Sequence, residues 1–241
     1  MINSGSAPSI INCVFVGNTS TENGGGIYNR NGASPTIVNC TFAGNSANAG
    51  GGAIENTSDS TPKIHNCILW DNSPATQINV NNHPETVVSH CLIQNGYAGG
   101  TSIVTDDPLF VDLANPVGAD GVFGTADDGL RLGLGSPAIN VGDNAVVPAE
   151  TSTDLSGAQR IQGGVVDMGA YEATAYRLNV VNGSGDGNYV TGATVTITAE
   201  SPTGMAFSQW TGDVATVADV GISPTTLTMP AQDITITATY Y

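Results

Sequence analysis

The amino-acid sequence repeats itself with a period of 27 residues. Three segments share the pattern Pro-x-Ile-x-Asn-Cys, at 8–13, 35–40 and 62–67, and a degenerate fourth copy runs through 87–95. A large apolar residue follows two positions after each Cys of the first three copies, and an Asn follows five positions after it. Short β-prone arms with turn residues at fixed offsets are typical of a β-solenoid, in which each coil buries its inner face only by stacking on the next.

Within one repeat, alternation assigns a direction to each side chain. Ile37, Cys40 and Phe42 are expected to point inward, Val38 and Thr41 outward, and Asn39 to take the corner between two arms. Because coils stack about 4.8 Å apart, equivalent residues should lie above one another. The corner asparagines should then form a ladder whose amides bond to each other and to turn backbone: Asn12, Asn39 and Asn66.

The four cysteines follow the repeat and should form one inward column: Cys13, Cys40, Cys67 and Cys91. Parallel Cβ vectors in register disfavour disulfides, and a linear file cannot offer a metal ion a tetrahedron of ligands. We therefore interpret these thiols as small buried hydrophobic groups.

The composition is typical of an all-β chain, and its negative charge argues against polyanionic partners. Glycine accounts for 31 of 241 residues, charged residues for only 11%, and the formal net charge is −16. Such a surface repels phosphate backbones and anionic headgroups, so we expect no nucleic-acid partner. The sequence also contains no apolar run long enough for a transmembrane segment.

The coils resemble the right-handed parallel β-helix repeats of bacterial surface proteins. Motifs at 107–112, 135–143 and 153–172 also resemble the closing section of the choice-of-anchor Q domain, which covers residues 1–172. This resemblance implies a secreted or surface-bound bacterial protein and no reaction. The opening residues lack a signal peptide, so we expect the chain to begin inside a longer protein with further coils.

Composition changes after residue 172, where cysteine disappears and strict alternation begins. Residues 173–241 should form a separate small all-β module, β-grasp-like or sandwich-like, with about five strands. The segments 207–213 and 226–240 resemble the divergent InlB B-repeat of bacterial surface proteins, whose modules act as spacers or binding elements.

The segment 118–129 carries the best candidate metal ligands: Asp120, Asp127 and Asp128. Oxygen-rich, flexible loops suit Ca²⁺, which would relieve repulsion between these carboxylates, although the spacing is not that of an EF-hand. The alternative is a solvated acidic loop. No cofactor is required by anything else in the sequence.

Trp70 is the candidate ligand contact. It stands at an outward position beside an apolar outward column, where it could stack on a sugar or a partner protein. The alternative is that the segment around 109–111 folds back and covers it. The three histidines are better explained as structural residues: His65 outward, His83 in a turn and His90 at a corner.

These observations favour a non-catalytic extracellular or cell-surface scaffold for adhesion or glycan binding. A polysaccharide lyase needs a cationic base, and a hydrolase needs paired carboxylates. Neither basic residues nor paired acids recur on one outward arm from coil to coil. Two alternatives remain: an enzyme fragment whose active site lies in preceding coils, and a structural stalk that binds nothing.

Overall fold

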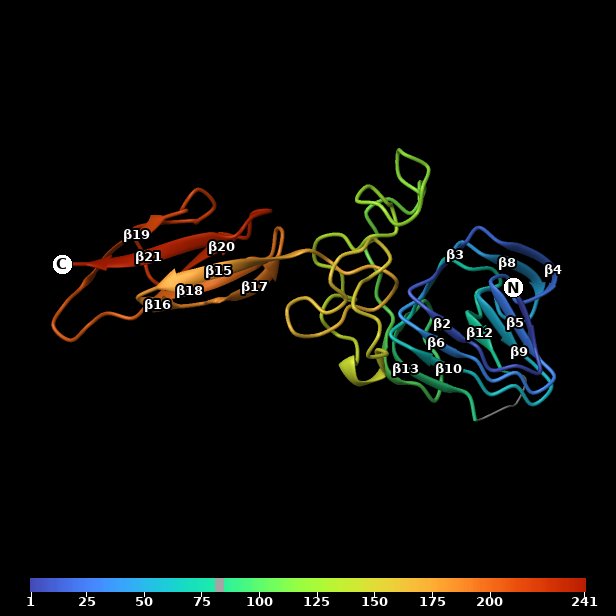
Figure 1. Cartoon of the computed structure of the whole chain (residues 1–241). Coiled ribbons are helices and arrows are strands. Elements are labelled where there is room, and N and C mark those ends of the chain that lie inside the picture. Colours follow the sequence, from blue (N-terminus) through green and yellow to red (C-terminus); the bar gives the residue numbers. More distant parts are fainter. Residues whose placement is uncertain (81–84) are drawn as a thin grey trace. The chain divides into compact units, whose positions relative to one another are not determined.

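The computed structural model describes residues 1–80 and 85–241. It divides into two compact units, Met1–Ala173 and Thr174–Tyr241 (Figure 1). The first is called the solenoid unit and the second the C-terminal unit.

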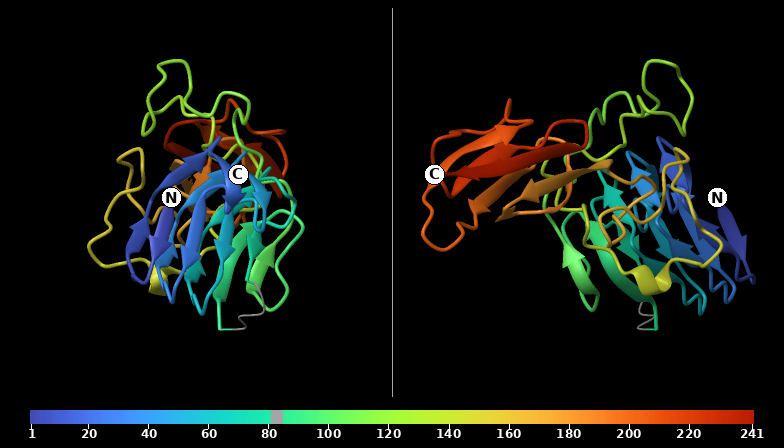
Figure 2. Two further views of the ribbon diagram at one scale, coloured as in Figure 1. Left: turned by 90° about the vertical axis from the view of Figure 1, so that its right-hand side faces the viewer. Right: turned by 60° about the vertical axis from the view of Figure 1, so that its left-hand side comes forward.

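Parallel strands stack along the solenoid unit in three sheets (Figure 2). The first sheet contains β1 (Ile2–Ser4), β5 (Ile27–Arg30), β9 (Ile54–Asn56) and β12 (Ile78–Asn79). The second contains β2 (Ser9–Ile11), β6 (Thr36–Val38), β10 (Lys63–His65), β13 (Val87–Ile93), β11 (Ile68–Trp70), β7 (Thr41–Ala43) and β3 (Val14–Val16), with β14 (Thr101–Val104) paired to β13. The third contains β4 (Thr19–Asn23) and β8 (Ser46–Ala49).

The strand register follows the sequence repeat. Ile10 pairs with Ile37, and Ile37 with Ile64, while Phe15 pairs with Phe42. These residues line one core together with the free cysteines Cys40, Cys67 and Cys91, and Cys13 packs against its end. The predicted inward directions and the inward cysteine column are therefore confirmed.

Asparagine ladders connect successive coils inside the solenoid. Asn45 Oδ1 accepts hydrogen bonds from the backbone N–H and the carboxamide of Asn18, at 3.1 and 2.8 Å. Asn72 accepts the same pair from Asn45, at 2.9 and 2.7 Å. Each buried asparagine amide thus finds its hydrogen-bond partner in the equivalent asparagine one turn away.

The predicted corner ladder is wrong, although the corners themselves are where the repeat places them. Asn12, Asn39, Asn66 and His90 all adopt a left-handed backbone, with φ between 49° and 52°. The asparagine side chains reach outward instead of toward one another, to the carbonyls of Thr153, Asp167 and Asp143, respectively. In this left-handed conformation each corner amide meets a segment that crosses the coils, called here the strap.

The strap comprises residues 105–172 and covers the outward face of the large sheet. Apart from the short 3₁₀ turn η1 (Asn144–Val146) it is irregular. It covers outward residues of the coils in two apolar clusters, one around Ala43 with Leu130 and Tyr171, the other around Ile68 with Met168. Thr41 and Val38 point outward as predicted, yet both are buried under this cover.

Glycine triplets occur where the chain turns tightly against the next coil. A Cβ on Gly25 would lie 2.2 Å from the carbonyl oxygen of Gly52, and one on Gly52 would lie 2.4 Å from that of Pro74. No side chain fits these positions without moving backbone. The triplets therefore set how closely the coils approach on this side.

The solenoid makes about three turns, fewer than the four coils expected. The fourth copy supplies β13, which continues both β10 and β11, but among the described residues no strand follows β12 in the first sheet or β8 in the third. His83 lies outside the described residues.

The C-terminal unit has two sheets that share one core. One sheet is β17 (Gly187–Val190), β15 (Ala175–Val181), β21 (Ile234–Tyr240) and β19 (Phe207–Gly212); the other is β16 (Gly183–Ser184), β18 (Thr194–Ala199) and β20 (Thr225–Thr228). Trp210, 1% exposed, sits in this core, and its indole N–H donates to the carbonyl of Ile222. The arrangement is sandwich-like.

Replacing Phe42 by Ala should destabilise the solenoid unit by about 3–5 kcal/mol. Phe42 is fully buried and stacks on Phe15 with ring centroids 4.7 Å apart. Chemical denaturation followed by circular dichroism measures the change. Leu134→Ala, at a position 60% exposed, is the control and should change stability by less than about 0.5 kcal/mol. Equal effects for both variants would contradict the assigned core.

Candidate functional site

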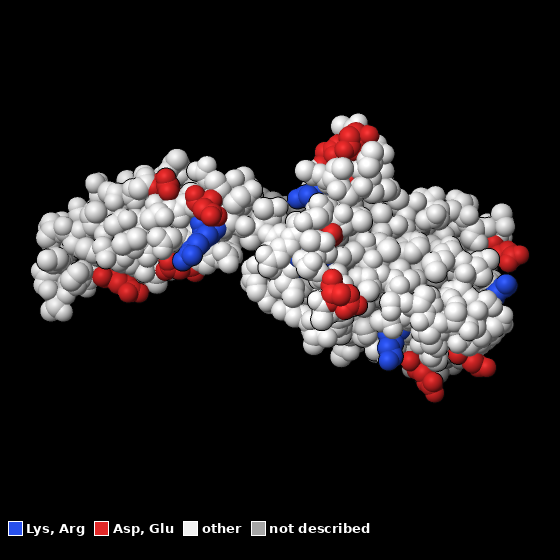
Figure 3. Space-filling model, viewed as in Figure 1, with Lys and Arg blue, Asp and Glu red and all other residues white. Residues whose placement is uncertain are grey.

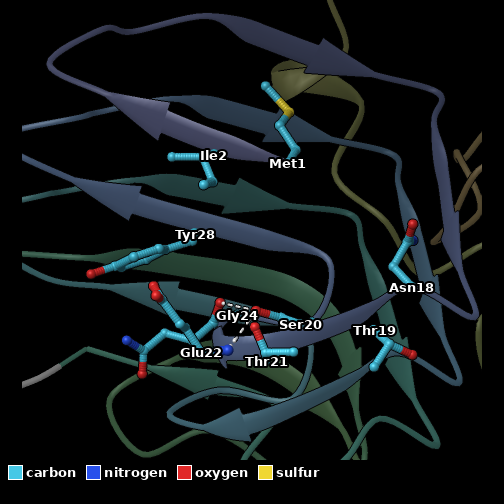
Figure 4. A pocket seen from close by; sticks show the side chains of 11 residues that line it. Met1, Ile2, Asn18, Thr19, Ser20, Thr21, Glu22, Gly24 and Tyr28 are labelled. Atoms are coloured by element: carbon cyan, nitrogen blue, oxygen red, sulfur yellow. Dashed lines mark hydrogen bonds between the residues drawn. The ribbon is translucent and has the colours of Figure 1, made fainter.

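A pocket of about 480 Å³ opens beside the first coil (Figure 4). It is lined by Met1, Ile2, Asn18, Thr19, Ser20, Thr21, Glu22, Asn23, Gly24, Gly25 and Tyr28. These residues come from β1 and Met1 before it, from β4 and Asn18 before it, and from the glycine turn and β5, which carries Tyr28. Sequence reasoning missed this pocket because the repeat does not show where two sheets meet around a turn.

One side of the pocket is apolar and aromatic. Tyr28 pairs with Ile2 in the outward row of the first sheet, and Figure 4 shows the two side chains close together. The Arg30 guanidinium carbon lies 5.9 Å from the centre of the Tyr28 ring. A half-buried aromatic ring of this kind offers a flat surface for stacking.

The other side is polar and comes from β4. Ser20 Oγ accepts from the backbone N–H of Glu22 at 3.2 Å and donates to the carbonyl of Asn23 at 3.1 Å. These contacts shape the β4 backbone, while the side chains of Thr19, Thr21 and Glu22 are exposed. Hydroxyls, one carboxylate and an aromatic ring are groups that recognise a polyhydroxylated ligand.

The pocket contains a single ionisable acid. Glu22 is the one Asp or Glu among its lining residues. Glycoside hydrolysis by the common mechanism needs two carboxyl groups flanking the scissile bond. The lining residues therefore do not supply the pair of acids for that chemistry.

Trp70 lies at the outward position predicted for it, beneath the strap. Its half-buried ring packs against a buried cluster formed by Ile68 and Leu92 of the coils and Ala138 and Met168 of the strap, which Phe110 and Leu132 of the strap also contact. The segment around 109–111 folds back over this face, as in the alternative interpretation. We therefore place the candidate ligand site at Tyr28 and not at Trp70.

The carboxylates of the acidic loop act as caps for loop backbone. Asp127 Oδ2 accepts from the N–H groups of Ala119 and Asp120, and Asp120 Oδ1 accepts from Val122 N–H. The hydrogen bond from the Thr125 hydroxyl, with these backbone donors, holds the pKa of Asp127 below its usual value. The repulsion that calcium was expected to relieve is thus reduced by hydrogen-bond donors.

Asp128 points into the protein and is fully buried. Its Oδ2 accepts from the N–H groups of Gly124 and Thr125 and from the Tyr171 hydroxyl, at 2.7, 3.0 and 2.7 Å. Burial and the contact with Asp128 raise the pKa of Tyr171 well above its usual value. Asp128 therefore connects the acidic loop to the strap core.

Metal-ligating side chains do not gather at one point in the part of the chain that the structure describes. There, no group of three His, Cys, Asp or Glu side chains is placed to hold a metal ion. Burial raises the pKa of the Cys40 and Cys67 thiols, which keeps them protonated. His65 Nδ1 lies 2.8 Å from Ser89 Oγ, and burial lowers its pKa.

Charged side chains are sparse on the face shown in Figure 3, where acidic groups gather at the tip of the projecting strap loop. Within residues 1–80 and 85–241, no helix is long and apolar enough to cross a membrane.

Comparison with known families found a match in each of two segments of the chain. Residues 1–113 match the family described as the right handed beta helix region. The solenoid is a right-handed parallel β-helix. Residues 162–241 match the divergent InlB B-repeat domain. A search of curated proteins found no match. These two domain types fit a bacterial surface or scaffold protein.

Calcium should leave the stability of the protein nearly unchanged, because the carboxylates at 120, 127 and 128 already accept hydrogen bonds from the loop. Melting temperatures in millimolar CaCl₂ and in EDTA should agree within about 1 °C, since an ion that does not bind the native state does not stabilise it. A rise of several degrees with calcium, lost in Asp127→Asn, would contradict this expectation.

Proposed function

We propose that this chain is a non-catalytic, extracellular bacterial surface scaffold that binds a neutral glycan at the Tyr28 pocket. The observation that carries the proposal is the pairing of an aromatic wall with the polar β4 wall around one cavity. The stacked coils beneath the pocket hold these walls at fixed separation.

Stacking supports a sugar as the ligand. The apolar face of a pyranose ring packs well on a tyrosine, while its hydroxyls need donors and acceptors around the rim. Tyr28 supplies the ring, and Thr19, Thr21 and Glu22 supply exposed polar groups. Most of these groups are neutral, which suits hydroxyls better than charged substituents.

Charge supports a neutral glycan over an acidic one. No Lys, Arg or His side chain is among the lining residues, although the Arg30 guanidinium lies beside the Tyr28 ring, and the whole chain carries a formal charge of −16. A uronic acid or sulfated sugar would meet long-range repulsion on approach. Neutral polysaccharide avoids this cost.

The remaining parts of the chain suit display at a cell surface. The closing motifs of the strap resemble those of the choice-of-anchor Q domain, and the C-terminal unit matches a repeat family found as spacers. We propose that the C-terminal unit spaces the β-helix from its attachment point. No cofactor is needed for this function.

Binding should be measured on a glycan array and by retention on insoluble neutral polysaccharide. Tyr28→Ala should weaken binding about tenfold, the loss expected when one aromatic stacking contact is removed. Tyr241→Ala is the matched control, because Tyr241 is 80% exposed and belongs to the C-terminal unit, and it should bind normally.

The alternatives give different results in the same experiment. Release of reducing ends from the polysaccharide would favour a carbohydrate-active enzyme. Absence of binding to every glycan would favour a structural stalk. Equal binding by wild type and Tyr28→Ala would contradict the proposed pocket.

A further inference from the structure

Four charged side chains are buried together in the strap, and their charges do not balance. Asp154, Arg160, Asp167 and Glu172 are each at most 5% exposed. Three of them are acids and one is a base. With all four ionised, the cluster would bury two uncompensated negative charges, which is costly in a low-dielectric interior.

Arg160 is the centre of this cluster. Its Nη2 donates to Glu172 Oε1 at 2.5 Å and to the backbone carbonyl of Asp167 at 3.2 Å. Its Nη1 donates to the corner side chain of Asn12 at 3.1 Å. One guanidinium therefore joins two parts of the strap to the first coil.

The three carboxyl groups accept hydrogen bonds from the backbone of the strap. Asp154 accepts from the N–H groups of Ser156, Ala158 and Glu172. Asp167 accepts from those of Asn140 and Ala173, and Glu172 accepts from that of Asp167 at 2.9 Å. Strap segments up to 33 residues apart (140 and 173) thus converge on one cluster.

The cluster lies where the strap is attached to the coils. The Asn12 carboxamide donates to Thr153 O at 2.7 Å, directly before Asp154. The Asn39 carboxamide donates to Asp167 O at 3.0 Å. The coils supply these neutral asparagines to the cluster, so they offer no positive charge to offset the acids.

We propose that Asp154, Arg160, Asp167 and Glu172 form a proton-dependent clasp that holds the strap on the β-helix and loosens as the pH rises above neutral. Protons on two of the three carboxyls leave one negative charge against the Arg160 guanidinium, so the cluster as a whole is electrically neutral. Losing those protons leaves like charges buried side by side. The strap can relieve this repulsion by moving the acids into water.

The titration of the two central acids supports this direction. Burial, together with the neighbouring Asp167 charge, raises the pKa of Glu172 to about 8. Burial raises the pKa of Asp167 to about 6. The folded state therefore binds more protons than the unfolded state between the ordinary carboxyl range and pH 8. The stability that these two groups contribute is present in acid and is lost as the pH rises through these values.

Other titratable groups near the strap act in a different pH range. Burial lowers the pKa of His65, whose electrostatic neighbours include Asp143, Lys63 and His90. This histidine contributes stability that is lost as the pH falls below its unfolded value of about 6.5. The responses of His65 and of the clasp are thus opposite in sign and separable by pH.

Trp70 reports on the strap because its ring packs against the apolar cluster that includes the strap residues Ala138 and Met168. Subtracting the fluorescence of the Trp70→Phe variant from that of the wild type gives the Trp70 signal and removes the signal of Trp210. Acrylamide quenching of this difference signal should increase several-fold between about pH 6 and pH 9, with unchanged far-ultraviolet circular dichroism. No increase, or an increase only with loss of secondary structure, would overturn the proposal.

Glu172→Gln tests the cluster directly, with Trp70→Phe introduced into the same background for subtraction. The variant keeps an oxygen for Arg160 and removes one ionisation, so its quenching should stay low to pH 9. Glu150→Gln is the matched control on an exposed strap residue and should respond like the wild type. A wild-type response in Glu172→Gln would overturn the proposal. If that variant does not fold, Asp167→Asn serves with the same expectations.

Discussion

Vertical stacking of equivalent residues is the interaction on which the solenoid unit depends. A lone coil cannot satisfy its buried amides or fill its interior, but an identical coil one turn away presents matching groups at matching heights. Asn45 shows this clearly: its side chain accepts from Asn18 and donates to Asn72, so one residue serves two neighbours. Phe42 does the same for packing, with Phe15 stacked on one face. Glycine at the tight turns is required by the same close approach.

Stacking of the coils leaves the outward apolar face of the large sheet uncovered, and the strap covers it. Outward side chains of the large sheet include Ile68 and Leu92, and a free sheet face this apolar would invite aggregation. The left-handed corners turn three asparagine side chains away from the coils, toward the strap. Because these corners lie at successive levels, one irregular segment is fixed to three coils at once. Register within the coils thus determines where the cover can attach.

The sequence predicted what is periodic and missed what is not. Inward residues such as Ile37 and Phe42, the cysteine file and the corner positions all follow from a 27-residue repeat with two-residue alternation. The partners of Asn39 and Arg160 do not, because they lie 128 and 148 positions away in a segment without periodicity. The sequence did not show that the carboxylates at 120, 127 and 128 accept hydrogen bonds from the loop backbone, because proximity in sequence does not reveal turn chemistry. The pocket at Tyr28 depends on how a turn meets two sheets, which no spacing encodes.

The two proposed activities use opposite properties of the same β-helix. Binding at Tyr28 needs walls that do not move, and those walls rest on β1, β4 and β5, each paired to an adjacent strand, with a register shift between Ser20 and Asn23 in the β4–β8 pair. The clasp needs a segment that can move, and the strap is held by side-chain contacts, by packing and by the hydrogen bond from the Gly169 N–H to the Asn66 carbonyl, with no strand ladder to the coils among the described residues. Opening the strap breaks hydrogen bonds to Asn12 and Asn39 but leaves the Asn45 ladder intact, because that ladder lies inside the coils. A β-helix can therefore lose its cover in a local transition while its coils, and the pocket built on them, stay folded.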